Sequence, residues 1–267
     1  MSLIVGICCT DGLVLGADDA ANFGTVSHPT IRTAYKKIRI VSDVAAISVA
    51  STTGVLQQYE DVLASNLAGD TLRAIRPVQA MNRLRDGFVE TANVQFQVAT
   101  LIQHEAGTRA WESCVAEVLV ATEVAGAYRL YHFDAHLAPQ EVTPELPFIA
   151  IGSGRLTADP FIAHLRRIYY PERNPDLALG VMTAAWVLKH AEETGAPGVG
   201  KGRQIVTLQG YGETRRVQQL TREQLQEAYE FIDRTEESMR SVSRLIQEPS
   251  VFDLPEAPTE NGDQNIA

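Results

Sequence analysis

The chain has 267 residues, of which 45% are hydrophobic, and 33 acidic side chains against 23 basic ones give it a net charge of −10. This charge argues against binding to nucleic acid, and no apolar run reaches the ~20 residues that a membrane-spanning helix requires. Three cysteines do not make a disulfide framework, and the start of the chain lacks the basic region of a secretory signal. We therefore expect a cytoplasmic protein with no nucleic-acid or membrane partner.

The first part of the chain indicates a β-hairpin followed by a loop. Apolar runs at 3–9 and 13–17 flank Asp11-Gly12, a dipeptide typical of hairpin turns. Neither run alternates with polar residues, so we expect strands that are covered on both faces. Residues 20–36 have no periodicity, which predicts a long loop.

Helices and strands then follow one another in blocks. The apolar pattern predicts strands at 37–41, 44–49, 115–122, 128–133, 146–151 and 204–208. Apolar spacings of three and four predict helices at 55–67, from Pro77 toward residue 100, from Thr157 and at 176–194. A last helix is predicted after the capping box Thr221-Arg222-Glu223-Gln224. Blocks of this kind favour an α+β fold with antiparallel sheets. Two helix pairs and doubly buried strands predict a four-layer α-β-β-α sandwich.

Composition divides the chain into one domain and a tail. All the predicted elements lie within residues 1–246. No Lys or Arg follows Arg244, and three prolines lie among acidic residues near the end of the chain. Because such a segment buries too little apolar surface to fold, we expect residues 247–267 to form a flexible acidic tail.

Ser2 is the first candidate for chemistry. The initiator methionine is removed readily when the next residue is small, and Ser2 would then carry both a hydroxyl and a free α-amine. An α-amine with a pKa of ~7.7–8.0 can accept the proton of the neighbouring hydroxyl. The alternative is an ordinary serine, since this residue is very common after Met1.

Asp18 and Lys37 are candidates for a buried pair that activates Ser2. The predicted hairpin places Asp18 opposite Ile4 and diagonally across from Ser2. Asp18 interrupts an apolar run, and a buried carboxylate needs a cation, for which Lys37 is the expected source. A lysine beside Ser2 would lower the pKa of the serine hydroxyl. The alternative is a strand-end ion pair without a catalytic role.

Several segments together resemble proteasome β-type subunits and their bacterial relatives, which are N-terminal nucleophile hydrolases with an α-β-β-α sandwich. These segments are Leu3-Ile4-Val5-Gly6, Asp11-Gly12-Leu13-Val14-Leu15-Gly16-Ala17-Asp18, Lys37-Ile38-Arg39-Ile40, Val49-Ala50-Ser51-Thr52 and Ile151-Gly152-Ser153-Gly154. The resemblance covers roughly residues 2–240. It implies a homo-oligomeric ring, which can stack into a double ring, that hydrolyses peptides or unfolded proteins without a cofactor or a metal. An ATP-dependent unfoldase is a further partner that it implies.

The resemblance also implies a role for each site residue. Carried onto this sequence, the roles are nucleophile for Ser2, activating pair for Asp18 and Lys37, oxyanion-binding backbone N–H for Ala50, organiser of the amine and its water for Ser153, and S1 pocket for Ser48 and Thr52.

Four features depart from the proteasome pattern. Serine replaces threonine at the position of the nucleophile, Ser2, and the loop between Asp18 and Lys37 is longer than usual. The arginine that usually follows the aspartate is absent, because Asp19-Ala20-Ala21 stands there. The late Asp-x-x-Ser motif is also absent, so a second carboxylate that supports the amine is unassigned.

Three functions are consistent with these residues. The leading one is a peptidase that uses Ser2 inside a ring. The missing arginine and Asp-x-x-Ser motif instead favour a catalytically silent ring or scaffold subunit, and an amidase acting on small amides is the third possibility.

Of the weaker motifs, His132 and His136 indicate a surface loop rather than a metal site. The Gly-rich stretch 198–202 follows a helix, the reverse of the order in a phosphate-binding loop.

Overall fold

The computed structural model describes residues 2–25, 28–32, 35–68, 72, 74–106, 114–210 and 214–246. The chain divides into two compact units, residues 1–229 and 230–267, which are described separately. The predicted tail, residues 247–267, lies outside the described residues, and the expected end of the folded domain at residue 246 stays a prediction.

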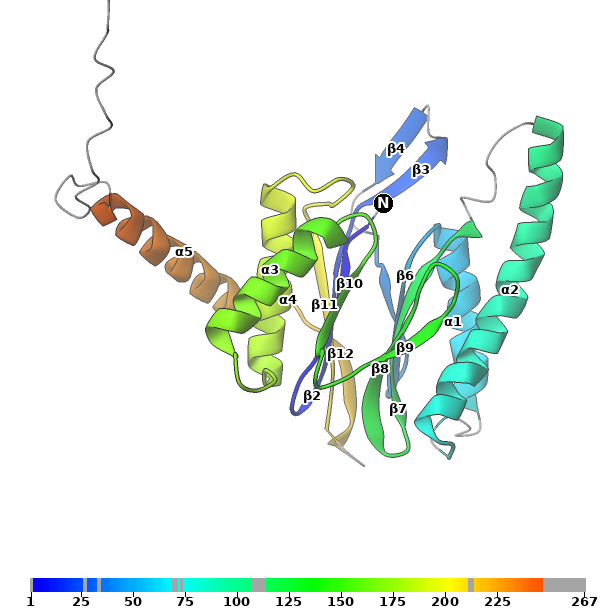
Figure 1. Ribbon diagram of the computed structural model, residues 1–267, viewed down its shortest axis with the longest axis horizontal. Helices are drawn as coiled ribbons and strands as arrows, with labels where there is room; N and C mark the ends of the chain where they lie inside the picture. Colours follow the sequence, from blue (N-terminus) through cyan, green and yellow to red (C-terminus); the bar gives the residue numbers. More distant parts are fainter. Residues whose placement is uncertain are drawn as a thin grey trace, which may run out of the picture. The chain divides into compact units, whose positions relative to one another are not determined.

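Two antiparallel five-stranded sheets form the centre of the first unit (Figure 1). The first sheet has the order β10-β1-β2-β11-β12 and the second β5-β6-β7-β8-β9, while β3 and β4 pair separately. The strands are β1 Ile4–Cys8, β2 Gly12–Asp18, β3 Ala21–Thr25, β4 His28–Arg32, β5 Ile38–Ser42, β6 Ala45–Ala50, β7 Glu117–Val124, β8 Ala127–Phe133, β9 Pro139–Val142, β10 Phe148–Ile151, β11 Arg203–Gln209 and β12 Arg216–Gln219.

A pair of helices packs on the outer face of each sheet (Figure 1). The helices are α1 Thr53–Leu67 and α2 Pro77–Ala106 on the second sheet, α3 Arg155–Tyr169 and α4 Leu177–Glu193 on the first, and α5 Gln226–Ile246, which continues into the second unit. This is the predicted α+β fold, with the layers in the order α-β-β-α. Within the described ranges, no helix is long and apolar enough to cross a membrane.

The first hairpin is buried on both faces, as its unbroken apolar pattern predicts. Every residue of β1 and β2 is buried. One face of these strands contributes to an apolar cluster between the two sheets, which includes Ile4, Leu15 and Leu119. The other face packs on α4, and Gly16 lies against Ala184 there. A sheet enclosed on both sides needs no polar residues in alternation.

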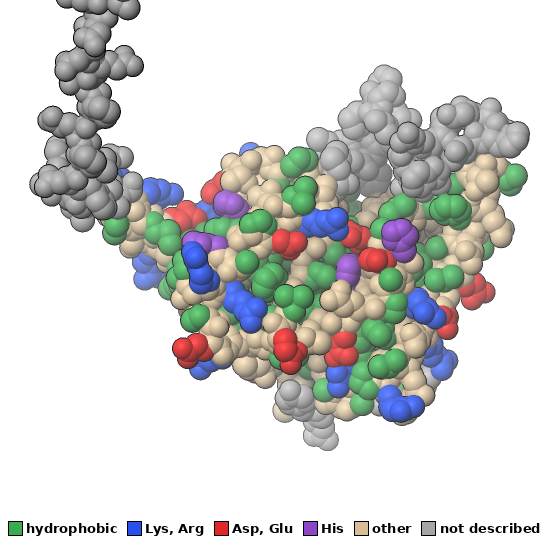
Figure 2. Space-filling view, viewed as in Figure 1, with side chains coloured by type: hydrophobic (Ala, Val, Ile, Leu, Met, Phe, Trp, Pro, Cys, Tyr) green, Lys and Arg blue, Asp and Glu red, His purple; other side chains and the backbone are tan. Residues whose placement is uncertain are grey.

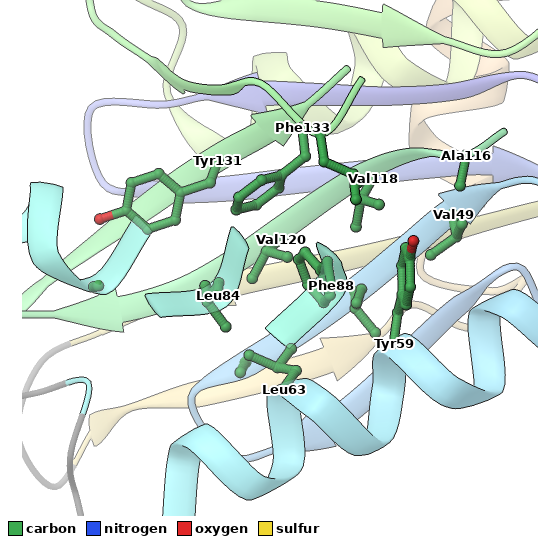
Figure 3. Close-up of a cluster of buried hydrophobic side chains, with 14 of the residues drawn as sticks. Val49, Tyr59, Leu63, Leu84, Phe88, Ala116, Val118, Val120, Tyr131 and Phe133 are labelled. Carbon is green, nitrogen blue, oxygen red and sulfur yellow. The ribbon is translucent and has the colours of Figure 1, made fainter. Parts of the chain in front are cut away.

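A second apolar cluster fills the space between α1, α2 and the second sheet (Figure 3). Phe88 of α2 stacks on Tyr59 of α1 with 4.6 Å between ring centroids, and meets Phe133 of β8 edge-on at 5.1 Å. All three rings are buried almost completely. On the face drawn in Figure 2, acidic and basic side chains are interspersed among apolar ones rather than gathered by sign.

Three short stretches differ from the sequence expectation. Residues 20–36 were expected to form a loop, but β3 and β4 pair as a hairpin within them. The edge strands β9 and β12, of four residues each, were not predicted at all. Pairing between strands is made by backbone groups, so it can form where the side chains carry no periodic signal.

The aromatic contacts around Phe88 predict a large loss of stability when this ring is removed. We expect Phe88→Ala to lower the free energy of unfolding by about 3–5 kcal/mol, because it leaves a cavity and removes the contacts with two rings. Phe96→Ala on the same helix is the matched control, since this ring is 49% exposed. Urea titration of both variants checks this, and equal losses would contradict the assignment of Phe88 to the core.

Candidate active site

The carboxylate of Asp18 is the centre of a buried polar cluster at the end of β2. Its Oδ1 accepts hydrogen bonds from Lys37 Nζ at 2.6 Å and from the backbone N–H of Leu3 at 2.8 Å. Its Oδ2 accepts from the backbone N–H groups of Ala20 at 3.1 Å and Gly200 at 2.9 Å. Asp18 is 0% and Lys37 4% exposed. The four donors compensate for the water that the carboxylate loses on burial.

The register of the first hairpin corrects the expected pairing by one residue. Ile4 lies opposite Ala17, and the backbone N–H of Asp18 donates to the carbonyl of Leu3 at 3.2 Å, so Asp18 lies opposite Leu3 and not Ile4. A shift of one residue exchanges the two faces of a strand. The expected diagonal placement of Asp18 across from Ser2 is therefore wrong. The link between the two residues runs instead through the backbone N–H of Leu3, the next residue in the chain.

Lys37 lies immediately before β5 and reaches from the second sheet to the first. Its carbonyl accepts a hydrogen bond from Ser48 Oγ at 2.8 Å. Burial lowers the pKa of Lys37 from its usual value of 10.5, and the carboxylates of Asp18 and Asp19 partly offset that effect. A buried lysine with a lowered pKa beside a candidate nucleophile is typical of sites that move or stabilise charge.

Ser2 lies against the turn that follows β10. Its backbone nitrogen is 3.1 Å from Ser153 Oγ, and its carbonyl accepts from the backbone N–H of Gly154 at 3.1 Å. Ser153 Oγ also lies 3.4 Å from the Ser2 carbonyl oxygen. In the full chain the Ser2 nitrogen is an amide, and removal of Met1 would make it an amine next to the same hydroxyl.

Gly152 allows the turn after β10 to approach Ser2 closely. Its φ is +86°, and a Cβ at this position would overlap the carbonyl oxygen of Ser2 and lie 3.4 Å from the Cβ of Ala50. Ala50 is the last residue of β6, so the structure brings the end of this strand beside Ser2.

The two residues expected in the S1 pocket have different surroundings. Ser48 is 0% exposed, and its hydroxyl donates to the Lys37 carbonyl, which favours a role in holding Lys37 over contact with a substrate. Thr52 is exposed at the N-terminus of α1, where its side chain makes no capping hydrogen bond.

Sequence reasoning missed the role of the Gly-rich stretch before β11. Besides the bond from Gly200 to Asp18, the backbone N–H of Gly202 donates to Asp19 Oδ1 at 2.8 Å. A Cβ at Gly202 would overlap the Asp19 carboxylate, so any larger residue would displace that side chain. This stretch therefore donates backbone hydrogen bonds to two of the protein's own carboxylates. The glycines at every second position from Gly198 to Gly202 were the only sequence signal for this approach.

Glu117 and Arg155 were also missed, and they join the second sheet to the turn beside Ser2. Glu117 is paired with Ala50 in the β6–β7 register. Its Oε2 accepts from the backbone N–H of Gly152 at 3.0 Å and its Oε1 from Arg155 Nη1 at 2.8 Å. A single glutamate at a strand start gives no sequence signal for contacts with residues more than thirty positions away.

Only one of the two histidines that were expected in a surface loop lies in one. His132 lies within β8 and is half-buried, and burial lowers its pKa, whereas only His136 lies in an exposed turn. In the part of the chain that the structure describes, no three His, Cys, Asp or Glu side chains are placed to hold a metal ion.

Two facing antiparallel sheets with outer helix pairs make up the proteasome-like fold, and known structures share it. Anbu (ancestral beta-subunit) from Yersinia bercovieri is 17% identical, with a TM-score of 0.63 over 94% of this chain and 100% of that one. Anbu from Hyphomicrobium sp. strain MC1 is 15% identical, with a TM-score of 0.65 over 93% and 100%. Its Gly-1 mutant is 17% identical, with a TM-score of 0.63 over 95% and 100%.

No protein-family model and no curated protein matches the sequence. At 15–17% identity, the likeness to the solved structures establishes the fold alone.

The close approach at Gly152 predicts a specific loss of stability. We expect Gly126→Ala, at φ +77° with open space around it, to cost about 1–2 kcal/mol from backbone strain. Gly152→Ala adds overlap with Ser2 and is expected to cost a further ~1–3 kcal/mol. Urea titration measures both, and the same loss in the two variants would show that the turn does not press against Ser2.

Proposed function

We propose that the chain is a proteasome-like peptidase whose nucleophile is Ser2, after removal of Met1. The observation that carries this proposal is the convergence on one buried carboxylate. Asp18 Oδ1 binds both the Lys37 ammonium and the backbone N–H that follows Ser2. A cation is thereby held next to the residue whose amine and hydroxyl would do the chemistry.

These positions support the following reaction. The Ser2 amine accepts the hydroxyl proton, and Oγ forms a bond to a peptide carbonyl carbon. The backbone N–H of Ala50 and the Lys37 ammonium stabilise the negative charge of the tetrahedral intermediate. The peptide C–N bond then breaks, and the leaving amine takes the proton from the Ser2 ammonium. Water, deprotonated by the same amine, hydrolyses the acyl-enzyme and restores Ser2.

Ser153 would hold the amine in place. Its Oγ donates to the carbonyl of Pro197 at 2.8 Å, which leaves its lone pairs directed to the Ser2 nitrogen at 3.1 Å. An acceptor at this position would orient the protons of the amine. The hydroxyl of Ser153 is thus a positioning group rather than a nucleophile.

The assembly and the substrates are further parts of the proposal. The resemblance to proteasome β-type subunits, together with the Anbu-like fold, supports a homo-oligomeric ring. The resemblance alone is the ground for peptides or unfolded proteins as substrates and for an ATP-dependent unfoldase as a partner. The alternatives are a catalytically silent ring subunit and an amidase for small amides. The absent arginine after Asp18 favours the silent subunit, because Asp19 stands at that position.

Intact-mass spectrometry after treatment with an epoxyketone tests the nucleophile. We expect a single adduct on protein that lacks Met1, because the reagent reacts with a hydroxyl and an amine on one residue. Ser2→Ala keeps a small second residue, so Met1 removal continues, while the adduct disappears and casein cleavage falls at least ~10³-fold. Ser42→Ala, at the far end of β5, is the matched serine control, and we expect it to keep both the adduct and casein cleavage.

Other outcomes distinguish the alternatives. Retained Met1 without an adduct would establish the silent subunit. An adduct with hydrolysis of small amides, but not of casein or fluorogenic peptides, would establish the amidase. Casein cleavage that survives in Ser2→Ala would disprove the proposed nucleophile.

The rate of peptide cleavage should depend on pH with two limbs. The rate rises as the Ser2 amine loses its proton, near its ordinary pKa of ~7.7–8.0. It falls when Lys37 loses its charge, and burial places this limb below the usual 10.5. Because the Asp18 carboxylate raises the pKa of Lys37, Asp18→Asn should move the alkaline limb to still lower pH. Lys36→Met, which removes the exposed neighbouring lysine, should leave it in place.

A further inference from the structure

The strand that follows Lys37 lies at the edge of its sheet. β5 is the first strand of the order β5-β6-β7-β8-β9, so one side of its backbone has no strand neighbour in that sheet. Ile38, its first residue, is paired with Ser48 of β6 and is only 2% exposed. Buried backbone groups on an open edge are costly unless a partner binds them.

The side chain of Gln204 supplies this partner from the other sheet. Gln204 lies on β11, next to the Arg203–Asp18 pair, and is 5% exposed. Its Oε1 accepts from the backbone N–H of Ile38 at 3.0 Å, and its Nε2 donates to the carbonyl of Ile38 at 2.8 Å. One primary amide thus binds both groups of one residue, as a neighbouring strand would.

This contact joins the same two sheets as the Lys37–Asp18 ion pair. Lys37 and Ile38 are consecutive, and they bind Asp18 of β2 and Gln204 of β11, which are adjacent strands of the first sheet. On the β6 side, Ser48 holds the Lys37 carbonyl. The backbone from which the lysine side chain departs is therefore fixed on both sides by side chains.

We propose that Gln204 is a positioning residue for Lys37, in which its amide replaces a missing strand neighbour of β5 and sets where the lysine nitrogen lies beside Ser2. The catalytic part of this inference rests on the proposed function. The contact of Gln204 with Ile38 is independent of it.

The charges and the burial around Lys37 determine how its pKa would respond to loss of the Gln204 amide. The charged groups that act on it are the carboxylates of Asp18 and Asp19, while the guanidinium of Arg203 binds Glu192 of α4. Without Gln204, the N–H and C=O of Ile38 would bind water, which would reduce the burial of the lysine. Because burial is the main cause of its lowered pKa, that pKa should rise toward its usual value.

The test compares Gln204→Met with Gln209→Met. Methionine has about the volume of glutamine and removes only the amide, and Gln209 lies at the other end of the same strand. One measurement is an NMR titration of protein with 13C-labelled lysine, in which Lys37 is assigned among the four lysines by Lys37→Arg. The other is the pH profile of peptide cleavage by the assembled protein.

We expect Gln204→Met to raise the titration midpoint of Lys37 by at least ~0.5 pH units and to move the alkaline limb equally. Its kcat should fall about tenfold with KM within twofold, because a misplaced group chiefly affects the transition state. Gln209→Met should match the wild type in each measurement.

The two measurements separate the two proposals. An unchanged Lys37 midpoint in Gln204→Met would overturn the positioning role, whatever the activity. A shifted midpoint in a protein that neither cleaves peptides nor forms an adduct would support the positioning of Lys37 and refute the peptidase.

Discussion

The buried carboxylate of Asp18 is the interaction on which the arrangement of the site depends. Its four donors come from the residue before β1, the residue before β3, the lysine before β5 and the glycine-rich stretch before β11. A charge without water must be satisfied by fixed groups, so these four segments must meet at one point. The bond to Lys37 also joins the two sheets at this end of the molecule. Ser2 lies where it does because its neighbour is one of the four donors.

The second constraint is the close approach of backbone segments around Ser2 and the two acids. Gly152, Gly200 and Gly202 each lie where a Cβ would overlap a neighbouring group. The approach lets backbone N–H groups act as donors, and these are held more rigidly than long side chains. Glu117 and Gln204 extend the same pattern, since each bridges the two sheets by binding the backbone of a residue beside the site. Fixed donors and acceptors of this kind are what charge stabilisation requires.

Most of the helices and the longer strands could be predicted because their signals are local. The apolar spacing of α1, α2 and α4 and the Asp11-Gly12 turn are contained within one element or one hairpin. The strands β9 and β12 are too short to show a period, and β3 and β4 lie in a stretch without one. The one-residue register error at Asp18 had the same origin, because composition predicts a turn but not its residue count.

The sequence by itself determined the types of the helices and longer strands, the order of the layers and the need of Asp18 for a cation, because apolar periodicity and the cost of a buried charge follow from local residues. Only the tertiary structure decided which groups meet that charge and which strand neighbours Lys37 has. Gly200 and Gln204 lie more than 150 positions from their partners, and the packing of two sheets determines such contacts. No pattern in one segment can encode them, because the distance between the segments is defined only in the folded chain.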